Sequence, residues 1–152
     1  MPDTDYTPLN HKLETALATY LLGARAGMAL DGLQVIDSHQ DAAALDSPRV
    51  VVRCDGLDPR SPDLPGIFDA QVMVDYISQP PEVTAAAHKT TAGTLASWLH
   101  DVATVKAALT ATDGLHCYFY EALGSSFSAD EEAGTQTTII SLKIVCQGKS
   151  VS

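Results

Sequence analysis

IFDAQVMVDYIS, residues 67–78, is the stretch from which the rest of the fold can be worked out. Apolar and polar side chains alternate along it, so that one face of an extended chain collects Phe68, Ala70, Val72, Val74 and Tyr76. The opposite face collects Asp69, Gln71, Met73 and Asp75. An alternation with a period of two over this length predicts a long β-strand with one face on a core and the other in water.

Four further stretches predict strands on either side of this one. On its N-terminal side they are LQVID at 33–37 and RVVVRC at 49–54, whose three consecutive valines favour a pleated, half-buried surface. On its C-terminal side they are LHCYFYEAL at 115–123, which is rich in aromatic residues, and TIISLKIVCQ at 138–147, which alternates again. The predicted core face of this last strand comprises Ile140, Leu142, Ile144 and Cys146. Its opposite face comprises Ser141, Lys143 and Gln147.

Helical segments flank the run of strands. Thr7-Pro8 is typical of an N-cap followed by a first helical residue, and the amphipathic helix after it is predicted to end near Gly27. Pro80-Pro81 stops the long strand, and the segment after it has the three-and-four apolar spacing of a helix. The residues with this spacing are Leu95, Trp98, Leu99, Val102, Val105 and Leu109. Asp101 and the β-branched residues after it could break this helix in two.

The predicted order of elements is therefore α-β-β-β-α-β-β. Strands that run together between two helices, without a regular strand-helix alternation, indicate an α+β fold. We expect two main helices packed on one face of a mostly antiparallel sheet. A length of 152 residues favours one domain that spans residues 1–152.

Two connections are long enough to suggest contacts with other molecules. DGLDPRSPDLPG, residues 55–66, holds three prolines and two glycines and is predicted to be a loop. Leu123–Gly134, between the last two strands, is far longer than a hairpin connection needs. The contact residues expected in this second loop are Leu123, Ser125, Ser126, Phe127, Asp130, Glu131 and Glu132. Those expected in the first are Leu57, Asp58, Arg60, Asp63 and Leu64. The alternative is that both loops are merely solvated connections.

The composition excludes several classes of protein. With 45% hydrophobic and 18% charged residues the chain is too apolar to be disordered. A formal charge of -10 argues against a surface that grips nucleic-acid phosphates. Three cysteines, an odd number without CxxC spacing, are expected to be buried thiols in a reducing compartment. No stretch approaches the roughly 18 apolar residues of a membrane span, and the polar N-terminus predicts no secretory signal.

Few residues suggest chemistry. His39 lies between Asp37 and Asp41 and could gather a divalent ion, but a solvated polar turn is the favoured interpretation. His100-Asp101 and His116-Cys117 are adjacent pairs, whose side chains point apart in a helix or a strand. The common nucleotide, zinc and hydrolase motifs are missing, and the serines of ALGSSFS have no histidine near them in sequence. We therefore predict no catalytic, cofactor-binding or metal-ligating residue, no cofactor, and no enzyme.

The order of elements, the size and several local patterns together resemble the tail terminator proteins of long-tailed bacteriophages. The matching pieces lie between residues 9 and 147 and are LETALATYLL, RVVVRC before a proline-rich stretch, FDAQVMVDYIS, LASWLHDV and TTIISLKIVCQ. The resemblance implies an α+β subunit of a hexameric ring at the head-proximal end of the tail tube. Such a ring stops growth of the tube and offers a docking face to the head or neck.

The resemblance also implies partners for the chain. These are further copies of itself, the tail tube protein and a head-completion or neck protein, met in the host cytoplasm and kept in the virion. The genome would pass through the ring without specific binding, because an acidic lumen repels phosphate. The two long connections would then contact neighbouring subunits or the tube. The alternatives are another phage neck or head-completion protein, or a small cytosolic α+β ligand-binding domain or enzyme.

Overall fold

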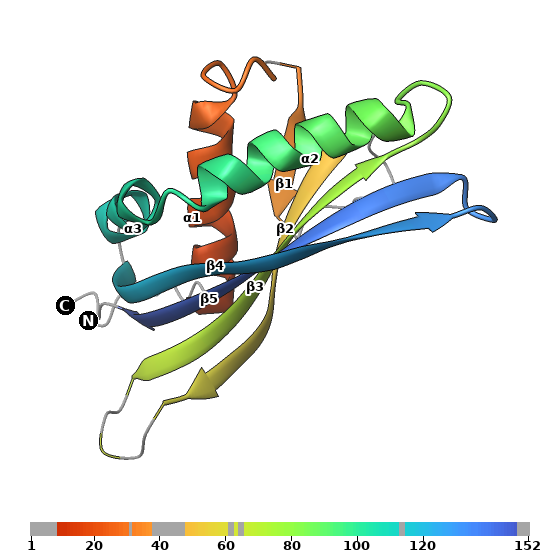
Figure 1. Ribbon diagram of the computed structural model, residues 1–152. Helices are drawn as coiled ribbons and strands as arrows, with labels where there is room; N and C mark the ends of the chain where they lie inside the picture. The colour runs from red at the N-terminus through yellow and green to blue at the C-terminus, as the bar shows by residue number, and fades with distance from the viewer. Residues whose placement is uncertain are drawn as a thin grey trace, which may run out of the picture.

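The expected α+β class is confirmed by a computed structural model of the chain (Figure 1). The structure describes residues 9–30, 32–37, 48–60, 63, 66–112 and 115–148. The elements in these ranges are α1 (Leu9–Ala24), β1 (Gln34–Asp37), β2 (Arg49–Pro59), β3 (Ile67–Ser78), α2 (Ala85–Leu99), α3 (Val102–Ala111), β4 (Leu115–Asp130) and β5 (Thr135–Gly148). The strands form one sheet in the order β1-β2-β3-β5-β4, in which only the β1–β2 pair is parallel.

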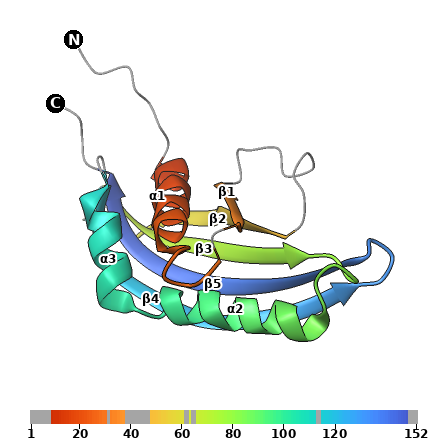
Figure 2. The same ribbon diagram turned by 90° about the horizontal axis from the view of Figure 1, so that it is seen from above.

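The helices all lie over one face of the sheet (Figures 1 and 2). The second predicted helix is divided into α2 and α3, as the sequence suggested at Asp101. The Asp101 carboxylate caps α3, because it accepts hydrogen bonds from the Thr104 amide at 3.4 Å and the Thr104 hydroxyl at 2.8 Å. The prediction that Val102 lies on the apolar face is wrong, since the break changes the phase of the helix and leaves Val102 44% exposed.

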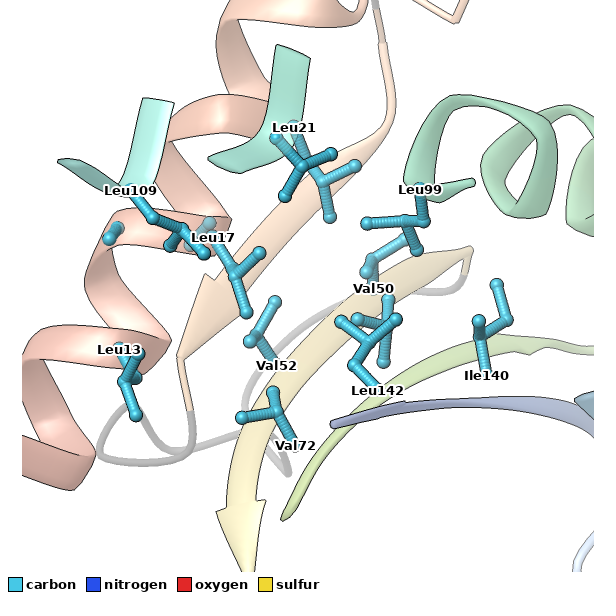
Figure 3. Close-up of a cluster of buried hydrophobic side chains, with 14 of the residues drawn as sticks. Leu13, Leu17, Leu21, Val50, Val52, Val72, Leu99, Leu109, Ile140 and Leu142 are labelled. Atoms are coloured by element: carbon cyan, nitrogen blue, oxygen red, sulfur yellow. The ribbon is translucent and has the colours of Figure 1, made fainter. Parts of the chain in front are cut away.

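The core lies between this face and the helices (Figure 3). The predicted inner face of β5 is confirmed, because all four of its residues are 2% exposed or less: Ile140, Leu142, Ile144 and Cys146. The inner face of β3 is buried from Ala70 to Tyr76, while Phe68 is half-buried. From α1, which lies over β1 and β2 and beside α3, the leucines at positions 13, 17 and 21 join the same core. Each fully buried leucine contributes roughly 1.5–3 kcal/mol of transfer free energy.

The proline-rich connection is shorter than predicted, because β2 continues through Asp55 to Pro59 and pairs with β3. The prediction of a loop over that part is wrong. β1 pairs with β2 as far as Val52, and beyond this point no strand in the described part of the chain pairs with that side of β2. A proline is tolerated on an edge because its missing N–H leaves no partner strand unpaired. An irregularity between Cys54 and Gly56 bends the strand there.

The prediction of a loop over Leu123–Gly134 is also wrong for most of its length. β4 runs on to Asp130, and β5 begins at Thr135, so only residues 131–134 turn the chain. Gly134 has a φ of +67°, a conformation that suits glycine. The sequence pattern indicated a loop because every residue from Leu123 to Asp130 is exposed. A strand without a buried face needs no alternation of apolar residues, and its ladder uses backbone groups alone.

Candidate functional site

The far half of the β4–β5 hairpin, residues 123–139, is here called the arm. Part of it packs against α2, and only its tip extends past the helices (Figure 1). The arm contains every residue predicted to make contacts in the second loop. Leu123 is 49% exposed and Phe127 41%, which is unusual for large apolar side chains. The acidic residues Asp130, Glu131 and Glu132 are exposed at its tip. The arm thus offers apolar and anionic groups at the periphery of the sheet.

A buried polar cluster joins the arm to α2. His88 of α2 is fully buried, with Nδ1 2.6 Å from Ser78 Oγ and Nε2 2.9 Å from Thr138 Oγ1. Gln136 Nε2 also donates a hydrogen bond of 2.8 Å to the carbonyl of Val83. Burial lowers the pKa of His88, with a smaller effect from the nearby charge of Lys89. The ring is therefore neutral at physiological pH.

Aromatic contacts add to this attachment. The ring of His88 stacks on Tyr76, with centroids 4.5 Å apart, and meets the ring of Phe127 edge-on at 5.4 Å. The Lys89 ammonium lies over Phe127, 4.9 Å from its centroid. These contacts attach the arm to α2. This cluster could not be predicted from the sequence, because a single histidine in a helix carries no pattern and its partners come from distant strands.

The other predicted contact segment lies at the opposite end of the sheet (Figure 1). Leu57 is half-buried and packs against the core. Asp58 and Asp63 are exposed, and Arg60 forms an ion pair of 3.1 Å with Asp69. Leu64 lies outside the described residues. The structure therefore does not bring the two predicted contact segments together.

The face of the sheet away from the helices, here called the outer face, has a depression that the sequence did not predict. The depression has a volume of about 370 Å³ and is lined by Arg60, Ile67, Tyr118, Phe119, Lys143 and Val145. An irregularity between Cys117 and Phe119 places both Tyr118 and Phe119 on this face, where they are 43% and 44% exposed. Tyr118 is fixed by a hydrogen bond of 2.7 Å from its hydroxyl to Gln147 Oε1. A bulge of this kind breaks the alternation on which the prediction relied.

The adjacent pairs do not form catalytic dyads. Asp101 is a helix cap, and the His100 ring bonds the carbonyl of Ala96 through Nδ1 at 2.7 Å. His116 is half-buried beside Tyr118, whereas Cys117 is buried in the core. Within the described ranges no three His, Cys, Asp or Glu side chains gather as metal ligands. His39 and Asp41 lie outside those ranges, as does the Asp37 side chain.

The cysteines are free thiols in the structure. Burial raises the pKa of Cys54 to about 11 and that of Cys146 to about 12, and it raises the pKa of Cys117 as well. All three are thus protonated at neutral pH and are poor nucleophiles. Among the described helices none is long and apolar enough to cross a bilayer.

Comparisons with known proteins add little to this picture. No protein-family model matches the chain, and no curated protein matches it. Among solved structures, the chain is similar to one from "Virion of native gene transfer agent (GTA) particle", with a TM-score of 0.49 and 13% sequence identity. The alignment covers 90% of this chain and 94% of that one. A likeness at this level assigns no role to any residue.

Proposed function

We propose that this chain is a structural virion protein, a subunit of a hexameric ring that caps the tail tube of a phage or phage-derived particle. The ring ends growth of the tube, and its free face receives the head-completion or neck protein. The proposal starts from the resemblance of the sequence to tail terminator proteins, whose α+β order the fold matches. Its other support is the surface of the molecule.

The observation that carries the proposal is the arm. A strand of 16 residues, β4, forms one edge of the sheet and ends in an exposed acidic tip. Long open edges invite pairing with other chains, and monomeric proteins usually shorten or cover them. Here the edge is long, and the β5 strand that pairs with it is fixed to His88 of α2 and to the carbonyl of Val83. Such a feature is of use to a subunit that meets neighbours.

The second candidate is another neck or head-completion protein of the same particle. It would use the same arm, but in a ring of different symmetry or at another position between the tail tube and the head. An enzyme or small-ligand protein is less well supported. The depression on the outer face is lined by aromatic, aliphatic and cationic side chains, and its lining contains no nucleophile with a neighbouring general base.

Electron microscopy tests the proposal directly. The purified chain, and tails that contain it, would be imaged by negative stain and by reconstruction at the head-proximal end of the tube. The expected result is a six-fold ring, with a native mass close to six times 16.0 kDa in isolated rings. A chain found as a single decoration, or at the tube end with a symmetry other than six or three, would contradict the ring. Placement at another position between the tail tube and the head would favour the second candidate.

A further inference from the structure

We propose that the depression on the outer face of one copy binds the acidic tip of the arm of a second copy. This inference rests on the proposed ring, because it names the two surfaces through which neighbouring subunits meet. The contact is heterologous, which means that each subunit contributes its depression on one side and its arm on the other. The depression would be the receiving surface and Asp130–Glu132 the entering one.

The apolar part of the depression suits a protein partner. Tyr118 and Phe119 lie side by side on the outer face and expose nearly half of their surface. Aromatic residues of this kind are enriched in the centres of protein interfaces. Ile67 and Val145 add further apolar side chains to the lining of the depression.

The charged part of the depression selects an anion. Lys143 makes no ion pair with any residue in the described ranges, and its cross-strand neighbour on β4 is Glu121. Arg60 binds Asp69 at 3.1 Å but keeps 48% of its side chain exposed. The chain has 19 acids against 9 basic residues, so most pairs of surfaces on two copies repel each other. A patch with two cations can attract an acidic surface of another copy.

The tip of the arm is arranged to present its charge. The Asp130 carboxylate accepts hydrogen bonds from the amides of Glu132 and Ala133, both at 3.1 Å. This carboxylate therefore holds the turn in shape. Glu131 and Glu132 are exposed and form no ion pair within the described ranges. Their two carboxylates are the groups that we assign to Lys143 and Arg60 of the neighbouring copy.

The two surfaces are too far apart to meet within one molecule. Phe119 and Asp130 lie 11 residues apart on β4, which is about 36 Å at roughly 3.3 Å per residue. Figure 1 shows the tip of the arm and the start of β4 at opposite ends of the hairpin. The contact must therefore join different copies. Repetition of a head-to-tail contact gives a closed ring when the rotation between copies allows closure, and a filament when it does not.

Charge reversal tests the contact in the full-length chain. Lys143→Glu and the double variant Glu131→Lys, Glu132→Lys should each weaken self-association at least ~10-fold, because like charges then face each other. Lys143→Gln should give a smaller loss. The chain that carries all three charge reversals should recover ring formation. Matched controls are Lys106→Glu on α3 and Glu82→Lys before α2, which should assemble like the unmodified chain; native mass and negative-stain images give the readout.

Cysteine cross-linking gives an independent test. A mixture of Phe119→Cys and Glu132→Cys chains should form an intermolecular disulfide under mild oxidation, whereas either variant alone should not. The native cysteines will not compete, because their raised pKa values and burial keep them unreactive. Rings that persist in Lys143→Glu, or cross-links that form only between two Glu132→Cys chains, would overturn the proposed contact and leave the ring itself intact. Absence of any ring from assembled tails would overturn the proposed function instead.

Discussion

At the scale of single residues, His88 is a titratable side chain buried in the core. It lies fully buried between Ser78 and Thr138 and has a lowered pKa. Its folded-state pKa is below that of the unfolded chain, so the unfolded chain binds more protons between the two values. The stability that this effect contributes is present above the unfolded value of about 6.5. It is lost as the pH falls below that value toward the lower, folded one.

We therefore expect the free energy of unfolding to decrease between pH 7.5 and pH 5.5 by more than in His88→Gln, which cannot take up a proton. Urea unfolding at the two pH values measures this difference. His100→Gln is the control, because His100 is exposed and contacts only a backbone carbonyl. Equal pH dependence in His88→Gln and the unmodified chain would show that His88 does not cause it.

Leu142 tests the orientation of β5. Its side chain is 2% exposed and lies in the core, on the face of the sheet that the helices cover. Leu142→Asp would place a carboxylate without a partner in the core, at a cost of several kcal/mol against a total stability of about 5–15 kcal/mol. We expect no soluble protein, whereas Ser141→Asp, on the other face, should express normally. Soluble Leu142→Asp with an ordinary melting temperature would contradict the assigned register.

At the scale of elements, the sequence predicted the strands that have a buried face and failed for those without one. The alternation in β3 and the inner face of β5 follow directly from burial. The second half of β4 and the end of β2 carry no such pattern, because their side chains are exposed or lie at the edge of the sheet. Prolines, serines and glycines in those segments then suggested loops. The outer depression was missed because it depends on a bulge and on side chains from four separate segments.

We expect the subunit to fold without the end of the arm when both strands of the hairpin are shortened together. Residues 128–137 would be replaced by Asn-Gly, which joins Phe127 to its ladder partner Thr138 through a two-residue turn. The bond between Thr138 and His88 is kept, whereas that from Gln136 to Val83 is lost. We expect a folded subunit, less stable by about 1 kcal/mol, that no longer forms rings or joins heads to tails.

Circular dichroism, thermal melting and particle infectivity measure these outcomes. A glycine turn that removes only Ser125 to Ala133 is the informative contrast. That change deletes the strand opposite Gln136–Ile140 and should destabilise the sheet strongly. Infectious particles at the normal level from the matched deletion would exclude a role of the arm in assembly.

At the scale of the whole molecule, the reactivity of the thiols tests whether the chain unfolds cooperatively. Cys117 and Cys146 are cross-strand neighbours in the core, and Cys54 lies half-buried on β2. With thiols that stay protonated well above neutral pH, we expect negligible reaction with a disulfide reagent at pH 8 in the native state. Added denaturant should release Cys117 and Cys146 together, at the unfolding transition. Release of either one alone well below the transition would reveal a local opening of the β4–β5 hairpin.

The unequal edges of the sheet have a consequence for the subunit before it meets its partners. β1, at one edge, has four residues in the described part of the chain, whereas β4, at the other, has 16. A newly made chain therefore has one border along which cross-β growth could begin at high concentration. The two irregularities in β4, near Tyr118 and near Leu123–Gly124, divide that border into short lengths that fit poorly against a second flat strand. We expect these irregularities to oppose fibril formation, so removing either one should shorten the time for which a concentrated solution stays clear.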